Sequence, residues 1–387
     1  MNSQGGLHLS KKDLMTFRVI EDYRQGKLSR EEASLKLNVS IRTITRKAKA
    51  IREEGIEGLV HGNRGKAPIN KTSNSIKEWY LNLYKQRYFD FNFFHALEFI
   101  LLQHEPKDKV CYSTFVRWGR QIGLGKIKKR RASKARIARD RKANEGLMLQ
   151  MDGSHHAWNG RDKWALINVI DDASSKLMGG QFYPGETTFA CMNIVRSIIE
   201  RYGAPEFILT DKAGWSARIG KRAHFSQFER ACNELGITVI STSNAESKGR
   251  IERSFRTCQD RLIAEMRLYE IKTMIDANRY MDQVFIPDWN ERFGVQAEET
   301  STRFREIPKY IDLGEIFCLK HKRQVNRDHT VHYEGKKYRI MQPPHRLWKH
   351  EVIIHEHEKG QIKIFYGAQE LQIEPVKSNW KHQRKYA

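Results

Sequence analysis

Two aspartates of this chain stand where they could act together on a phosphate ester. The apolar run GLMLQM, residues 146–151, ends on Asp152, and the run EFILT, residues 206–210, ends on Asp211. Two carboxylates that lie close together in a partly dry site repel each other, and divalent cations relieve that repulsion by accepting oxygen ligands. The two aspartates therefore predict a metal site, on the condition that their strands are neighbours.

A third ligand is expected from residues 243–262, which contain Glu246 and Glu252. Four apolar residues of this segment have the spacing of an inward-facing helical stripe: Ile251, Phe255, Cys258 and Leu262. Glu252 lies beside that stripe, about one turn into the helix, where its side chain could reach the edge of a sheet. Glu246 precedes the helix in a loop rich in Ser and Asn. We therefore expect Glu252 to be the third ligand.

Each acid also has an ordinary structural explanation. Asp152 fits a turn at a strand end, and Asp211 fits a cap of the turn that follows it. Glu252 stands four residues from both Lys248 and Arg256, so an ion pair along one helix face is the simple alternative. Convergence of all three acids on one sheet favours the metal site.

The order of elements around these acids predicts a ribonuclease-H-like sheet within an α/β domain. Residues 146–290 contain three strand-like runs, followed by helical segments that alternate with two short apolar strands. In such a sheet the first strand is central, and the strand that ends at Asp211 lies beside it. Asp171 and Asp172 also end a strand, but by this topology we expect nothing later in the chain to pair with them.

The charge of the chain indicates a polyanionic partner. The 387 residues include 69 Lys and Arg against 46 Asp and Glu, which gives a net charge of +23. Basic side chains gain affinity for DNA by releasing counterions from its phosphates, although an anionic membrane surface is a rival partner. No run approaches about 18 apolar residues, and we expect no membrane span and no signal sequence. The five cysteines form no C-x-x-C pair, so no structural zinc site is expected.

The N-terminal part has the spacing of a helix-turn-helix domain, in which Ser29 and Ser40 are placed to cap successive helices. The second of these helices carries an outward face suited to the major groove: Arg42, Thr43, Arg46 and Lys47. For this domain, an ordinary helical hairpin with a solvated basic face is the alternative. Residues 73–124 are expected to form a second helical unit, with aromatic residues in its core and a recognition helix that begins near Ser113.

A basic segment connects these helical units to the sheet domain. Residues 126–142 contain ten Lys or Arg and one acid, and we expect this segment to follow DNA phosphates, a solvated linker being the alternative. The residues expected to touch phosphate here are Lys128, Lys129, Arg130 and Arg131. Short strand-like pieces near the C-terminus predict a small β-barrel or curled sheet. The expected α+β multidomain order is therefore helix-turn-helix domain 9–61, second helical domain 73–124, basic linker 126–145, ribonuclease-H-like core 146–290 and small β-barrel 310–387.

The motifs around the acids resemble a known family. The stretches QMDGSHHAW, INVIDDAS, ERYGAPEFILTDKAG and SKGRIERSFRTCQDRL are similar to the integrase catalytic core of bacterial insertion-sequence transposases of the ISNCY type, and more distantly to retroviral integrases. The resemblance covers residues 147–290 well, and the domain order extends it over most of the chain. It implies an acidic triad of Asp152, Asp211 and Glu252, because the last acid of the family follows the pattern K-G-x-x-E-R. The 40 residues between Asp211 and Glu252 exceed the spacing in retroviral relatives.

The resemblance implies a DNA transposase that uses Mg²⁺ or Mn²⁺, two ions per active site, to cleave DNA and transfer a strand. Its partners would be double-stranded DNA, both element ends and target, and further copies of the chain, because two ends must be joined. Lys248, Arg250 and Arg253 would approach substrate phosphates. The location would be cytoplasmic, at the nucleoid of a bacterium. A catalytically inactive DNA-binding regulator derived from a transposase, and a nuclease that cleaves without joining, are the alternatives.

Overall fold

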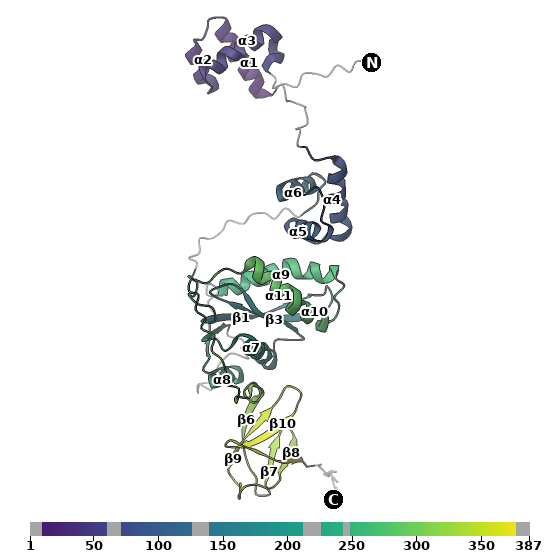
Figure 1. Cartoon of the computed structure of the whole chain (residues 1–387), viewed down its shortest axis with the longest axis vertical. Coiled ribbons are helices and arrows are strands. Elements are labelled where there is room, and N and C mark those ends of the chain that lie inside the picture. Colours follow the sequence, from purple (N-terminus) through teal and green to yellow (C-terminus); the bar gives the residue numbers. More distant parts are fainter. Residues whose placement is uncertain (1–9, 60–70, 126–138, 212–225, 243–247, 377–387) are drawn as a thin grey trace, which may run out of the picture. The chain divides into compact units, whose positions relative to one another are not determined.

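The computed structural model describes residues 10–59, 71–125, 139–211, 226–242 and 248–376 (Figure 1). The chain divides into two compact units, residues 1–78 and residues 79–387. Within the described residues, no helix has the length and apolar character needed to cross a membrane.

The first unit contains three helices and a short 3₁₀ turn: α1 (Lys11–Arg24), α2 (Arg30–Leu37), α3 (Ile41–Glu54) and η1 (Gly55–Leu59). The Ser29 side chain accepts from the N–H of Glu32, and the Glu32 carboxylate accepts from the N–H of Ser29, so the predicted cap of α2 is a reciprocal capping box. Asn38 ends α2 in the left-handed conformation, and Ser40 caps α3. The buried residues that hold the helices together include Ile20, Ala33, Ile44 and Ile51.

The second unit begins with a bundle of three helices: α4 (Asn74–Arg87), whose first residues belong to the first unit, α5 (Phe93–His104) and α6 (Tyr112–Gln121). Its centre is aromatic. The rings of Tyr80 and Tyr84 both lie within contact of Phe115, and all three are buried. Many of the aromatic residues of this region are therefore core residues, as expected, whereas four others are exposed: Trp79, Phe89, Phe94 and Tyr112.

A five-stranded sheet follows, with the order β3-β2-β1-β4-β5. Its strands are β1 (Met148–His156), β2 (Trp164–Asp171), β3 (Leu177–Tyr183), β4 (Phe207–Thr210) and β5 (Thr238–Ser241). β1 pairs antiparallel with β2 and parallel with β4, and β4 pairs parallel with β5. The first strand is thus central and borders the strand that leads to Asp211, as predicted.

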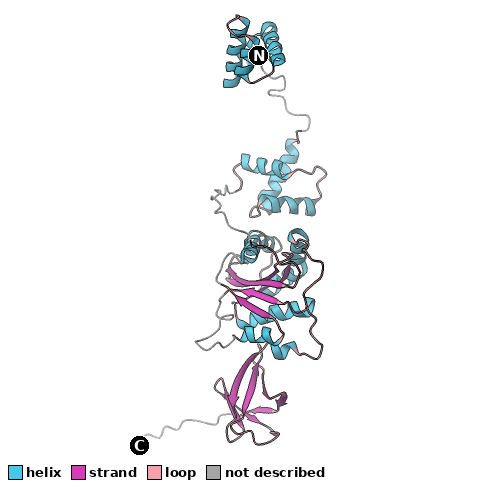
Figure 2. Cartoon of the chain, turned by 90° about the vertical axis from the view of Figure 1, so that its left-hand side faces the viewer, coloured by secondary structure: helices cyan, strands magenta, loops and turns pink. Residues whose placement is uncertain are grey.

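Helices cover both faces of this sheet (Figure 1, Figure 2). One layer contains α7 (Thr188–Tyr202) and α8 (Gln227–Glu234); the other contains α9 (Gly249–Leu268), α10 (Met274–Tyr280), the π-helical turn η3 (Met281–Phe285) and α11 (Ile286–Phe293). Leu149 and Met151 pack with α7 and α8, whereas Leu166 and Ile170 pack with α9. All four residues of the predicted α9 stripe are buried.

The bundle α4–α6 lies against the outer face of α9 through polar contacts made by α5 and the residues just before it. The His95 Nε2 atom is 2.8 Å from Glu265 Oε1, and both side chains are buried. Arg267 donates two hydrogen bonds to the Asp90 carboxylate. The second helical domain is therefore attached to the sheet domain through buried as well as surface polar contacts.

The C-terminal part contains α12 (Leu313–Ile316), β6 (Leu319–Gln324), β7 (Thr330–Tyr333), β8 (Lys336–Ile340), β9 (Glu351–Glu356), β10 (Ile362–Tyr366), β11 (Gln369–Leu371) and β12 (Ile373–Pro375). These strands form two open sheets, β11-β10-β9-β6 and β12-β8-β7, on one shared core. The described residues therefore form a curled pair of sheets in place of a closed barrel. The chain passes from one sheet to the other at Gln372, which alone separates β11 from β12, as at a corner between packed sheets.

Candidate active site

Strands β1 and β4 bring the two predicted aspartates to the same edge of the sheet. Gln150 pairs with Leu209 in parallel register. The same register, carried two residues further along both strands, sets Asp152 opposite Asp211. Neighbouring strands lie about 4.8 Å apart, so the two carboxylates leave the sheet side by side.

A buried cation stands between these carboxylates. The Lys248 Nζ atom lies 3.7 Å from Asp152 Oδ1 and 3.8 Å from Asp211 Oδ2. Lys248 is the residue before α9 and is only 7% exposed. The site therefore already balances two negative charges with a positive one.

Burial raises the pKa of Asp152 from 3.8 to about 6, and the nearby negative charge of Asp211 adds to this rise, whereas Lys248 opposes it. The carboxylate form of Asp152 is thus penalised by its surroundings in the absence of a further cation. A carboxyl whose pKa is strongly raised at the edge of a sheet is typical of a functional site.

Glu252 lies in the first turn of α9, and it is exposed. Among the described residues, one group of three potential metal ligands has all its ligand atoms within 4.8 Å, and that group does not contain Asp152, Asp211 or Glu252. The alternative third ligand, Glu246, lies outside the described residues. The structure thus brings the two aspartates together and leaves Glu252 one helical turn beyond Lys248.

The donors at this edge fit a hard divalent cation. Asp152 and Asp211 provide carboxylate oxygens, the ligands preferred by Mg²⁺ and Mn²⁺, and they face a position that already attracts an ammonium group. Glu252 would supply a third carboxylate from the adjacent helix.

The group that does satisfy the 4.8 Å limit consists of Glu315, Cys318 and His355 in the C-terminal part. Its carboxylate is already neutralised by Lys363, whose Nζ lies 2.5 Å from Glu315 Oε1, and it lies 2.7 Å from His355 Nδ1 through Oε2. Burial also raises the pKa of the Cys318 thiol to about 11. These residues form an ion-pair network that ties α12 to β9 and β10.

The expectation that nothing later in the chain pairs with Asp172 is wrong. Asp172 is fully buried and accepts a hydrogen bond from Arg250 of α9 at 2.8 Å. Gln150 of β1 donates a second bond, at 2.6 Å. The topological argument considered strands alone, whereas these donors are long side chains that reach across from other elements. Arg250 is consequently directed at Asp172, and not toward solvent where a substrate phosphate would lie.

Two further residues near the site were not predicted as functional from the sequence. Glu186 Oε2 lies 3.7 Å from His155 Nε2, and the charge of Glu186 contributes to the raised pKa of Asp152. Gln150 shares the sheet face of Asp152, because side chains two residues apart point the same way. A polar residue inside an apolar strand was the available signal for Gln150.

The predicted DNA-reading residues of α3 differ in exposure. Arg42 and Arg46 are exposed, whereas Thr43 and Lys47 are half-buried. The Thr43 hydroxyl lies 2.9 Å from that of Ser40 and takes part in the helix cap. Arg253 of α9 is exposed, and Lys128, Lys129, Arg130 and Arg131 lie outside the described residues.

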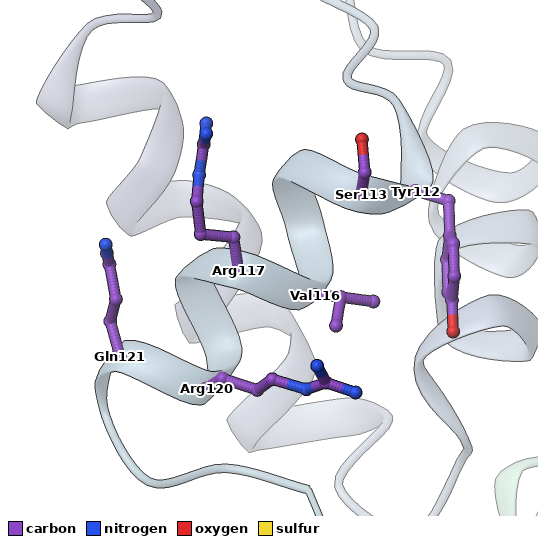
Figure 3. A pocket seen from close by; sticks show the side chains of 6 residues that line it. All are labelled: Tyr112, Ser113, Val116, Arg117, Arg120 and Gln121. Carbon is purple, nitrogen blue, oxygen red and sulfur yellow. The ribbon is translucent and has the colours of Figure 1, made fainter. Parts of the chain in front are cut away.

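The predicted second recognition helix, α6, has an open pocket along its exposed side (Figure 3). Two adjacent rows of side chains line it, spaced four residues apart: Tyr112, Val116 and Arg120 in one row, and Ser113, Arg117 and Gln121 in the other. Both arginines are exposed.

Comparison with known proteins finds relatives named as transposases, so the resemblance predicted from the motifs is confirmed. The Transposase for insertion sequence IS1202 of Streptococcus pneumoniae is 29% identical over 359 residues, which cover 83% of this chain and 76% of the relative. The y4bF protein of Sinorhizobium fredii, whose name also refers to a transposase, is 28% identical over 345 residues and covers 86% and 74%. No protein-family model matches the chain.

Solved structures that resemble the chain contain retroviral integrases. A chain of the simian T-cell lymphotropic virus intasome in complex with PP2A regulatory subunit B56 gamma is 16% identical over 69% of this chain and 88% of its own, with a TM-score of 0.34. The HTLV-2 integrase catalytic core domain in complex with magnesium is 18% identical over 41% and 94%, with a TM-score of 0.30. Similarities this low support no conclusion about function.

Proposed function

We propose that this chain is a DNA transposase that binds the terminal inverted repeats of an insertion sequence, cleaves DNA at the element ends and joins those ends to a target. The observation that carries the proposal is the pair Asp152 and Asp211, which leave adjacent strands and face one cation at 3.7 and 3.8 Å. A net charge of +23 and relatives named as transposases support it.

In this proposal Asp152, Asp211 and Glu252 hold two Mg²⁺ or Mn²⁺ ions, which supply activation of the attacking oxygen and stabilisation of the leaving 3′-oxygen when bound. Asp152 gives up its proton near neutral pH, because its pKa is about 6. Lys248 balances the two carboxylates, and its ammonium group would be available to a substrate phosphate if the carboxylates held metal. The first attack uses water and the second uses a DNA 3′-hydroxyl, so no covalent protein–DNA intermediate is needed.

Strand transfer on DNA that carries the element ends tests the proposal. Wild-type protein with Mg²⁺ should yield joined products. Asp152→Asn, Asp211→Asn and Glu252→Gln should each lower the rate by about a thousandfold, which corresponds to about 4 kcal/mol of transition-state stabilisation. Glu246→Gln is the matched control and should retain activity.

The same assay separates the other possibilities. Retained activity in Glu252→Gln with loss in Glu246→Gln would assign the third ligand to Glu246. Binding of element ends without any metal-dependent nick would favour an inactive regulator, and nicks that never become joined ends would favour a nuclease.

Recognition of the element ends is assigned to α3 and α6, whose exposed arginines point away from their helical cores. Arg46 lies in the first half of α3, the part of a recognition helix that contacts base edges, whereas Arg52 lies in its last turn.

Arg46→Ala should weaken binding to element ends by about 10- to 100-fold at fixed salt and leave non-specific binding nearly unchanged. Arg52→Ala removes the same charge and should have little effect on specificity. Equal losses in both variants, measured by fluorescence anisotropy, would contradict this assignment.

A further inference from the structure

The helix that carries Glu252 begins without a cap of its own. Lys248 precedes α9 and makes no side-chain capping hydrogen bond. The first N–H groups of a helix have no partner inside the helix, so a buried helix start needs an acceptor from elsewhere. Here the N–H of Ile251 donates to Gln150 Oε1 of β1 at 3.2 Å. A strand residue thus caps the helix one residue before Glu252.

The same glutamine is held in place by a buried carboxylate. Gln150 Nε2 donates to Asp172 Oδ1 at 2.6 Å, and both residues are 0% exposed. Asp172 Oδ1 also accepts from Arg250 Nη1 at 2.8 Å. The backbone of the first turn of α9 is therefore tied to Gln150, and its side chain at position 250 is tied to Asp172.

Asp172 also receives donors from the last residues of the basic segment. Arg139 forms an ion pair with Asp172 Oδ1, and the N–H of Lys142 donates to Asp172 Oδ2 at 3.0 Å. Arg250 Nη2 donates in turn to the backbone oxygen of Arg139 at 3.1 Å. One buried carboxylate thus joins the end of the basic segment, the central strand and the helix of the third acid.

The neighbouring aspartate shows that this arrangement is not a general property of the strand end. Asp171 is equally buried, but its carboxylate accepts from the N–H groups of Gly146, Ala173 and Ser174. Those bonds hold a local turn and the start of β1. Asp171 therefore offers the same chemistry and burial, with its hydrogen bonds directed to the local turn and to the start of β1.

We infer that Gln150 and Asp172 are positioning residues that fix the first turn of α9, and hence Glu252, relative to Asp152, and that connect this turn to the basic segment at Arg139. The inference rests on the proposed function, because it assumes that Glu252 is a metal ligand. The rigidity of the first turn of α9 can nevertheless be measured without any catalytic activity. Removing a group that orients a ligand lowers metal affinity by about 10- to 100-fold in known sites.

The test compares Asp172→Asn with Asp171→Asn in the full-length protein, using two measurements that need no catalysis. Amide hydrogen exchange should become faster at Ile251 and Glu252 in Asp172→Asn, and Mn²⁺ affinity, measured by electron paramagnetic resonance, should fall about 10- to 100-fold. Asp171→Asn should lower the thermal unfolding midpoint without changing either quantity. If both variants leave the exchange of α9 and the Mn²⁺ affinity at wild-type values, the positioning role is overturned.

A second variant covers the case in which Asp172→Asn does not fold. Gln150→Met has similar volume, keeps Asp172 with its arginines and removes only the acceptor of the Ile251 N–H and one donor to Asp172. It should show the same faster exchange and weaker Mn²⁺ binding, and wild-type values for both would overturn the inference. Faster exchange in these variants, together with a wild-type protein that neither cuts nor joins DNA, would remove the transposase proposal and leave the positioning role standing.

Discussion

The ionised carboxyl group of Asp152 lowers the stability of the folded protein when no metal is bound. Its pKa is about 6 in the folded protein against 3.8 for an ordinary aspartate, mainly because it is buried. Between these two values the unfolded chain binds fewer protons than the folded one, so this residue makes stability fall as pH rises from about 4 to about 6. Well below about pH 4, Asp152 is protonated in both the folded and the unfolded chain, and stability is not reduced. Well above about pH 6, it is ionised in both, and the loss of stability is complete.

Because ionised Asp152 lowers stability, we expect a neutral residue at this position to stabilise the metal-free protein. In EDTA, Asp152→Asn should raise the thermal unfolding midpoint of the second unit at pH 7.5, because a neutral amide avoids the burial of charge, and the gain should shrink to about a third at pH 4.5. Scanning calorimetry of both proteins at the two pH values measures it. A gain of equal size at both pH values would mean that the charge of Asp152 is not the cause. Added Mn²⁺ should stabilise the wild type more than the variant, since it binds only the folded site.

At the scale of elements, the sheet and its helices approach closely at one glycine. A Cβ atom on Gly180 of β3 would lie 2.6 Å from Met281 Cε and 2.8 Å from Asn168 Oδ1. The π-helical turn η3 begins at Met281, so this glycine permits its contact with the sheet.

Gly180→Ala should therefore lower the free energy of unfolding of the second unit by about 1 kcal/mol, the low end of the usual cost of overpacking, because the flexible end of Met281 can move whereas Asn168 is fully buried. Gly185→Ala is the control, because a Cβ atom there would meet nothing within 4 Å, and it should change stability by no more than about 0.5 kcal/mol. Denaturant titration compares the two. Equal stability of both variants would show that β3 and η3 are not packed as described.

At the scale of the whole second unit, the bundle α4–α6 is attached to α9 by one buried polar pair, His95 and Glu265, and by ion pairs nearer the surface. The side chains of His95 and Glu265 are almost fully buried, whereas those of Arg267 and Asp90 are about one-third exposed. Breaking a buried pair leaves an unpaired buried charge, while solvent screens an exposed pair.

His95→Ala should therefore destabilise the second unit by about 3 kcal/mol or more, and Arg267→Ala by about 1 kcal/mol or less. His95→Ala also removes the ring stacked on Phe91 at 4.2 Å, which acts in the same direction. Thermal unfolding followed by tryptophan fluorescence would detect the difference, and a larger loss in Arg267→Ala would reverse the proposed order of importance.

The sequence by itself determined the local elements and the edge of the sheet where the acids lie. Apolar runs that end on Asp152 and Asp211, and the stripe from Ile251 to Leu262, depend on spacing along the chain, and that spacing is what fixes strands and helix faces. The strand order followed because few topologies allow a meander to continue into parallel strands with helical crossovers.

Only the tertiary structure decided how buried polar groups are paired. Lys248 between the two aspartates, Arg250 on Asp172 and Gln150 on the N–H of Ile251 join segments that lie far apart in the sequence. A long side chain can reach several elements, and which one it reaches depends on how the helices pack on the sheet. Periodicity records which face a residue occupies, and it carries no information about the partner that satisfies a buried charge there.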